Sequence, residues 1–271
     1  MDADRISIDR ASIDRVSIEL TNQCSKACRF CYNASGPGEA TAWQPHEVVD
    51  LAADCARHGV KAVAFGGGEP LEYAGLLDVL DALRGQIFRS LTTNGLHLDA
   101  CFDALVRSAP DKVHVSIHAP GNAAEVDRVI TQVGALAGAG IRSGVNLLVR
   151  ASQLPEAAAA AERVRAAGIG NDRIVYLPMR GQDTPSADEL GRVAGSRRFQ
   201  SMSCLLACGR SPRFVAIAWD KHVAWCSYTR SRRPLARLTH AALLAALDGL
   251  GLDPCTQPRA ERRPHRLPLA P

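Results

Sequence analysis

The sequence predicts an α/β domain built as a partial (β/α)6 parallel barrel, with a small β-hairpin and helix at its C-terminal end. Short β-branched runs alternate six times with helical patterns, which is typical of a parallel sheet with helices on its outer face. The alternation stops near Gly195, and a hairpin-like stretch follows. Six βα units are too few to close an eight-stranded barrel, so an open, curved sheet is expected.

The six expected units follow one another from the first strand onward. Strands are expected over residues 15–20, 60–65, 87–93, 112–118, 141–149 and 173–177. Helices are expected over residues 45–58, 72–84, 99–108, 123–139, 155–167 and 187–199. Gly59, Gly140 and Gly168 stand where helix C-caps are needed. In parallel folds of this kind, the ligand site lies at the carboxyl ends of the strands.

The remaining chain divides into an extension and a tail. The core is expected over residues 13–200, the extension over 201–255 and a basic, Pro/Arg-rich, disordered tail over 256–271. Within the extension, residues 214–219 and 223–228 predict a hairpin around the turn Asp220-Lys221-His222, and residues 239–247 predict a helix.

Composition limits the partners. The net charge of +4 comes from the end of the chain, where residues 229–271 hold eight Arg against three acidic residues. No aromatic residue follows Tyr228, so this basic part offers no stacking platform, and nucleic-acid binding is not expected. The sequence contains neither an apolar run of about eighteen residues nor a secretory signal pattern, which predicts a cytoplasmic protein without membrane partners. In that compartment the nine cysteines are expected to hold metal or do chemistry rather than form disulfides.

Three of those cysteines, Cys24, Cys28 and Cys31, lie within eight residues on the loop that leaves the first strand. Three thiolates can hold three irons of a four-iron cluster and leave the fourth iron open to an external chelator. A structural zinc ion would instead need a fourth protein ligand, such as His46 or a distant cysteine. The spacing alone leaves both kinds of site open. Cys55, by contrast, is expected to be a buried structural cysteine.

The Cx3Cx2C spacing, with the aromatic Phe30 before the last cysteine, resembles the radical SAM superfamily. A glycine run after the second strand resembles the second motif of that family, which receives the methionyl amino group of S-adenosylmethionine (SAM). Without Cβ atoms, the backbone there can turn sharply and approach a ligand. An unliganded glycine turn is the alternative, and a P-loop is excluded because no Lys-Ser/Thr follows. The run consists of Gly66, Gly67, Gly68, Glu69 and Pro70.

Weaker matches lie on the later strands. Ser116 and Asn146 correspond to positions that bind the SAM ribose or carboxylate in similar proteins. A polar residue in an apolar strand must find a partner, although neighbouring backbone is an equal candidate for that partner. The same cavity can be lined by Thr92, Thr93, Asn94 and Arg150, whereas His118 is expected to be structural.

The resemblance implies an enzyme. It implies a 4Fe-4S cluster, SAM, an electron donor of the flavodoxin or ferredoxin type, and reductive cleavage of SAM to a 5′-deoxyadenosyl radical that abstracts hydrogen from a substrate. A peptide or natural-product substrate is the leading hypothesis, and an epimerase or dehydrogenase of a small sugar-like molecule is the alternative. A non-enzymatic iron–sulfur or zinc protein is the competing class, but such a protein has no need of a SAM pocket at Glu69.

The extension partly resembles the SPASM/twitch extensions that hold an auxiliary iron–sulfur cluster. Cys204, Cys208 and Cys226 are the expected ligands of a second 4Fe-4S cluster, with Cys255 or a substrate as the fourth. The match is partial, because the hairpin turn lacks the usual Asp-Gly and too few cysteines are present for two auxiliary clusters. The alternatives are a hairpin with unliganded thiols and a role for Cys226 as a hydrogen-atom donor.

Overall fold

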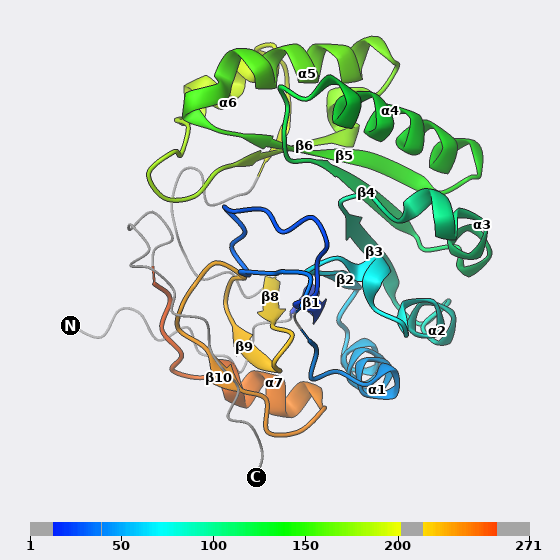
Figure 1. Cartoon of the computed structure of the whole chain (residues 1–271). Helices are drawn as coiled ribbons and strands as arrows, with labels where there is room; N and C mark the ends of the chain where they lie inside the picture. The colour runs from blue at the N-terminus through cyan, green and yellow to red at the C-terminus, as the bar shows by residue number, and fades with distance from the viewer. Residues whose placement is uncertain (1–12, 39, 202–213, 254–271) are drawn as a thin grey trace.

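A computed structural model describes residues 13–38, 40–201 and 214–253 of the chain. Ten strands form one sheet in the order β10-β9-β8-β1-β2-β3-β4-β5-β6-β7. Figure 1 shows this sheet as an open arc with α1 to α6 on its outer side, and the chain that follows β1 crosses the inside of the arc. The predicted fold class is confirmed, because the sheet is mostly parallel and is not closed.

The strands and helices alternate as the sequence predicts. The strands are β1 (Arg15–Thr21), β2 (Ala62–Gly67), β3 (Phe88–Thr93), β4 (Lys112–Ile117), β5 (Arg142–Val149), β6 (Ile174–Pro178), β7 (Gln200–Ser201), β8 (Phe214–Ile217), β9 (His222–Ala224) and β10 (Arg233–Pro234). The helices are α1 (Pro45–Arg57), α2 (Leu76–Ala82), α3 (Leu98–Ser108), α4 (Ala123–Gly138), α5 (Leu154–Ala166), α6 (Ala187–Val193) and α7 (His240–Leu247). Short 3-10 turns are η2 (Pro70–Glu72), η3 (Ala151–Gln153) and η4 (Asn171–Arg173). None of the helices in this part of the chain is long and apolar enough to cross a membrane.

The two faces of the sheet differ in polarity. On β4, Val113, Val115 and Ile117 are fully buried in the core that lies between the sheet and the helices. Because side chains alternate along a strand, His114 and Ser116 point to the opposite, inner face of the arc. The hydrophobic core therefore lies between the sheet and the helices, and polar side chains lie on the inner face of the arc.

Two helices are shorter than predicted. The segment expected to start a helix at residue 72 first forms η2, and α2 begins only at Leu76. The helix expected to reach residue 199 ends at Val193, because Gly195 (φ 72°) and Ser196 (φ 55°) adopt left-handed backbone conformations. The predicted C-cap positions have the expected left-handed backbone, with φ of 89°, 81° and 82° at Gly59, Gly140 and Gly168.

The C-terminal hairpin continues the main sheet. Strand β8 pairs in parallel with β1, from Arg15 opposite Phe214 to Ile18 opposite Ile217, and β9 returns antiparallel to β8. Helix α7 packs against α1 and β9. The extension is thus joined to the core through the first strand, the same strand that leads into the cysteine loop.

Lys221 explains how the hairpin turns without the usual glycine. Its φ of 62° lies in the left-handed region that favours glycine. Its Nζ lies 2.7 Å from both carboxylate oxygens of Glu47 and 5.3 Å from the centre of the Trp43 ring. Trp43 in turn donates its indole N–H to Ala218 O at 3.1 Å. The side chain therefore compensates for the backbone conformation by fastening the turn to α1.

Two substitutions at this turn separate the backbone from the side chain. Lys221→Gly and Lys221→Ala both lose the ion pair with Glu47, but only alanine keeps the left-handed strain. We expect the glycine variant to be more stable than the alanine variant by about 1 kcal/mol in denaturant unfolding. Equal stabilities would show that residue 221 does not adopt this conformation in solution.

Candidate active site

The cysteine loop is shaped by two tight turns. Ala27 N–H donates to Cys24 O at 3.3 Å, and Cys31 N–H donates to Cys28 O at 2.9 Å, so each turn spans four residues. Ala27 adopts a left-handed conformation with φ of 45°. Cys24 N–H also bonds to Gly36 O at 2.9 Å, which closes the loop on itself. The loop therefore has a defined shape built from its own backbone.

The three thiols lie close together without meeting at one point. Burial raises the pKa of the Cys28 thiol, Lys26 opposes this rise, and the thiolate charges of Cys24 and Cys31 add to it. Burial likewise raises the pKa of the Cys24 thiol. Within residues 13–38, 40–201 and 214–253, no three His, Cys, Asp or Glu side chains converge as they must around a single metal ion. A four-iron cluster takes each thiolate on a different iron, whereas a structural zinc ion would need a fourth protein ligand. His46 is exposed on α1.

Two polar contacts fasten the loop to the barrel, and sequence reasoning missed both. The backbone N–H and hydroxyl of Ser25 donate to Glu72 Oε1 at 2.8 and 2.7 Å. On the other side, Lys26 forms a 2.7 Å ion pair with Glu125 on α4. That carboxylate also accepts His118 N–H at 2.6 Å, beyond the end of β4. The only signal in the sequence is the presence of Ser25 and Lys26 inside the cysteine spacing.

The glycine run lies against the start of the cysteine loop. Gly68 N–H donates to Thr21 O at 2.7 Å, and Glu69 N–H donates to Gln23 O at 2.8 Å. These bonds extend the pairing of β1 and β2 beyond the last strand residue. The two sequence motifs are therefore joined backbone to backbone.

The three glycines of the run differ in the space around them. A Cβ on Gly68 would lie 2.1 Å from Gln23 O, and one on Gly67, whose φ is 108°, would lie 2.7 Å from Thr21 O. These two positions must be glycine because the strands approach each other closely. A Cβ on Gly66 would meet no atom within 4 Å. Gly66 is therefore the member of the run that leaves open space for a ligand.

The carboxylate of Glu69 is largely occupied by the protein itself. It is 1% exposed and accepts the hydroxyl of Thr93 at 2.7 Å, Asn94 N–H at 2.7 Å and Leu71 N–H at 3.0 Å. Burial raises its pKa, and these hydrogen bonds oppose the rise. Glu69 thus ties the end of β2 to the end of β3, and Pro70 starts η2 directly after it. Its side chain organises the pocket more than it offers a free ligand.

Phe30 lies between two side chains that project from later strands. The guanidinium of Arg150, at the end of β5, lies 4.2 Å from the centre of the Phe30 ring. The ring of His118 approaches it edge-on with centroids 6.1 Å apart. Burial lowers the pKa of His118 to about 4, so this histidine is neutral at pH 7. The Nε atom of Arg150 is buried without a hydrogen-bond partner in this part of the chain, as an atom facing a ligand site would be.

Ser116 and Asn146 lie side by side on the inner face, opposite each other in the pairing of β4 and β5. They are 3% and 8% exposed. Asn146 Oδ1 is 2.8 Å from Nδ1 of His114, whose pKa burial lowers to about 4. The amide of Asn146 is therefore partly engaged by a neighbouring side chain, and only its remaining hydrogen-bonding capacity is available to a ligand.

The proposed auxiliary site is described only in part. Cys204, Cys208 and Cys255 lie outside the described residues. Cys226 follows β9, is half-buried, and accepts Tyr228 N–H at 3.5 Å. The Tyr228 ring lies 4.8 Å from that of Tyr32, the residue after Cys31. The hairpin thus reaches the cysteine loop, while its cluster stays a prediction.

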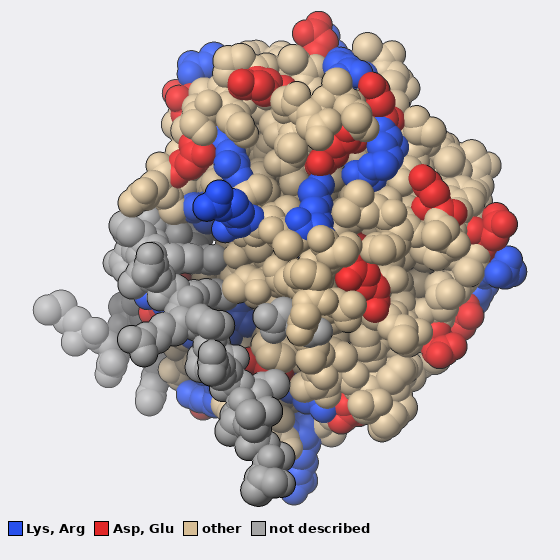
Figure 2. Space-filling view, viewed as in Figure 1, with Lys and Arg blue, Asp and Glu red and all other residues tan. Residues whose placement is uncertain are grey.

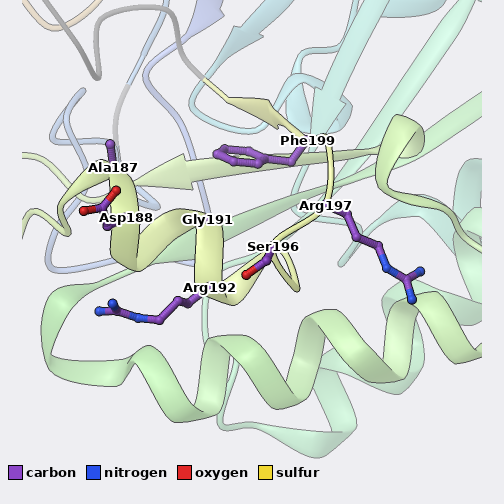
Figure 3. A pocket seen from close by; sticks show the side chains of 7 residues that line it. All are labelled: Ala187, Asp188, Gly191, Arg192, Ser196, Arg197 and Phe199. Atoms are coloured by element: carbon purple, nitrogen blue, oxygen red, sulfur yellow. The ribbon is translucent and has the colours of Figure 1, made fainter.

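A shallow hollow lies beside α6, and Figure 3 shows that its lining comes from this helix and the segment after it. It is lined by Ala187, Asp188, Gly191, Arg192, Ser196, Arg197 and Phe199, and it contains none of the predicted site residues. Basic and acidic side chains are interspersed over the face seen in Figure 2.

An open parallel barrel with a three-cysteine loop at the carboxyl end of its first strand defines a class of iron–sulfur enzymes. The chain belongs to the radical SAM superfamily, whose family model matches residues 18–186. It is accordingly an iron–sulfur, SAM-dependent enzyme, and the cofactors of its family are a 4Fe-4S cluster and SAM. This membership excludes the non-enzymatic class.

Curated relatives match a shorter stretch. A probable GTP 3′,8-cyclase from Methanocella arvoryzae is 38% identical over 98 residues, which cover 36% of this chain and 32% of that protein. The GTP 3′,8-cyclase of Chlorobaculum tepidum is 33% identical over 101 residues, covering 36% of this chain and 31% of that protein. The matched stretch is about a third of the length of each relative.

Solved structures match most of the chain. SuiB from Streptococcus suis bound to S-adenosylmethionine has a TM-score of 0.71 at 14% identity, covering 89% of this chain and 67% of that one. The same protein bound to its precursor peptide SuiA gives 0.69 at 14% identity, covering 88% and 65%. The protein anSMEcpe with bound AdoMet and a Cp18Cys peptide gives 0.62 at 12% identity, covering 84% and 79%. At these identities the likeness establishes the fold.

Because a Cβ has open space at Gly66 but not at Gly68, substitutions at these two positions should have different effects. Gly66→Val has open space and should leave unfolding and iron content unchanged, while weakening SAM binding at least about tenfold. Gly68→Ala should destabilise the protein by about 2 kcal/mol or more and lower its iron content, because its Cβ collides with the cysteine loop. Calorimetric titration with SAM and iron analysis measure both effects. If Gly66→Val binds SAM normally, the open space beside Gly66 is not the SAM pocket.

Proposed function

We propose that Cys24, Cys28 and Cys31 hold the 4Fe-4S cluster and that the enzyme uses it to abstract hydrogen from a peptide or natural-product substrate. The observation that carries this proposal is the arrangement of the three thiols. They lie on one loop that its own backbone hydrogen bonds shape, and they are close enough for the charges of Cys24 and Cys31 to raise the pKa of Cys28. When bound, the cluster and SAM supply a 5′-deoxyadenosyl radical.

In this proposal, the chain's own residues bind and orient SAM and keep water away from it. Gly66 leaves room at the end of β2 for the methionyl part of SAM. Arg150, held over Phe30, offers a cation to the SAM carboxylate from the end of β5. Ser116 and Asn146 offer polar contacts from the inner face. The buried, neutral ring of His118 helps to keep water from the same region.

A peptide substrate is favoured because structures solved with bound peptides match most of this chain. The structures solved with peptides, SuiB and anSMEcpe, cover 84–88% of this chain. The GTP 3′,8-cyclases match about a third of it. A nucleotide is therefore the second candidate, and the small sugar-like molecule is the third. Electron delivery by a flavodoxin or ferredoxin is part of this proposal.

The assignment of the primary cluster is tested by removing its ligands. Anaerobically reconstituted wild type with dithionite and SAM should yield 5′-deoxyadenosine and methionine. The triple variant Cys24→Ala, Cys28→Ala, Cys31→Ala should yield neither, because it lacks the thiolates that hold the irons. Cys55→Ala is the matched control, since this buried thiol lies in α1, away from the loop. Continued SAM cleavage by the triple variant would overturn the assignment.

The auxiliary cluster is tested by iron content. If Cys204, Cys208 and Cys226 hold a second cluster, the wild type should carry about eight irons and the triple alanine variant at these positions about four. This variant should still cleave SAM but lose turnover of the substrate. About four irons in the wild type would eliminate the cluster. Cys226 would then be tested as a hydrogen donor. The measurements are whether solvent deuterium enters the wild-type product and whether Cys226→Ala consumes SAM without forming product.

A further inference from the structure

Asn94 reaches the cysteine loop from the neighbouring part of the barrel. It directly follows β3, is 4% exposed, and its Nδ2 lies 3.6 Å from Cys24 Sγ, a hydrogen-bonding distance for sulfur. Its Oδ1 accepts Leu96 N–H at 2.8 Å. That second bond identifies the oxygen end of the amide, because a backbone N–H can only donate. The N–H end is therefore the one directed at the sulfur.

The loop that carries Asn94 is fixed from several sides. The backbone N–H of Asn94 donates to Glu69 Oε2 at 2.7 Å, and its carbonyl accepts Arg128 Nη1 at 3.2 Å. The next carbonyl, of Gly95, accepts Gln132 Nε2 at 2.8 Å. Gly95 has φ of 77°, and a Cβ there would lie 2.3 Å from Gln132 Oε1. The amide is thus held in place before any cofactor binds, so little reorganisation is needed to maintain its contact with Cys24.

A hydrogen bond to a cluster thiolate withdraws charge from the sulfur and stabilises the reduced, more negative cluster. Hydrogen bonds to the sulfurs are among the factors that set the reduction potentials of iron–sulfur clusters. We propose that Asn94 is a positioning residue that raises the reduction potential of the primary cluster through its N–H···S bond to Cys24. The inference rests on the proposed function, since it requires Cys24 to be a cluster ligand.

This inference gives the glycine-run glutamate an indirect part in the chemistry. Glu69 accepts the backbone N–H of Asn94, and the side chain of Asn94 contacts Cys24, so the second motif reaches the first through the residue that follows β3. The left-handed turn at Gly95 then has a purpose, since it places the amide within reach of the sulfur.

The test is a redox titration of the reconstituted cluster without SAM, followed by its electron paramagnetic resonance signal. Asn94→Leu removes the donor, and we expect the ratio of reduced to oxidised cluster at a fixed solution potential to fall several-fold. Asn94→Asp keeps an oxygen for Leu96 N–H but points a carboxylate at the thiolate, so the ratio should fall further. Both substitutions act on the cluster in the absence of turnover.

Thr93→Val is the matched control. It removes the hydroxyl that donates to Glu69 and accepts Gly95 N–H, so it loosens the same loop while keeping the amide of Asn94. Its reduced-to-oxidised ratio should fall by less than that of Asn94→Leu, because the loosened loop still carries the N–H donor. A shift as large as that of Asn94→Leu would mean that loop order, and not the N–H···S bond, sets the potential, and the inference would fail.

The remaining outcomes separate this inference from the function on which it rests. A wild type that assembles no four-iron cluster on Cys24, Cys28 and Cys31 overturns the proposed function. A wild type with the cluster and Asn94 variants of unchanged potential overturn only the inference, and weaker SAM binding in those variants would then assign Asn94 to the SAM pocket. Loss of iron from both Asn94 variants, with Thr93→Val fully loaded, would assign Asn94 to folding and also overturn the tuning role.

Discussion

The close approach of the ends of β1 and β2 is the constraint on which the candidate site depends. Gly68 and Glu69 donate their backbone N–H groups to Thr21 and Gln23, immediately before the first cysteine. No side chain fits between these strands at Gly68, where a Cβ would lie 2.1 Å from a carbonyl oxygen. These bonds fix the position and direction in which the cysteine loop leaves β1. The contacts of Ser25, Lys26 and Asn94 all depend on that position.

The sequence was sufficient for the order of elements and for the cysteine loop. Alternating β-branched and helical segments have strong periodicity, and three cysteines within eight residues are rare enough to stand out. Ser116 and Asn146 were singled out because each is a polar residue in an otherwise apolar strand. In each case, the information is local and lies within one segment of the chain.

The features that could not be predicted from the sequence depend on strand register and on which residues are neighbours in space. The difference between Gly66 and Gly68 follows from which residues of β1 lie opposite them, and the three glycines look alike in the sequence. Glu69 was expected to serve SAM, but its carboxylate accepts hydrogen bonds from Thr93, Asn94 and Leu71, the first two of which lie at the end of β3 and directly after it. Likewise, nothing marks Glu125 as the partner of Lys26 until α4 is placed beside the loop.

An open sheet has two edge strands, and here both are only two residues long. Strand β7 ends the described sheet on one side, and β10 ends it on the other with Pro234, which has no backbone N–H. Long exposed edges invite pairing with a second chain and hence aggregation, whereas short edges and prolines discourage it. By adding β8 to β10, the extension replaces the seven-residue edge of β1 with a much poorer template. The described sheet can therefore stay open without offering a long edge strand for pairing with a second copy of the chain.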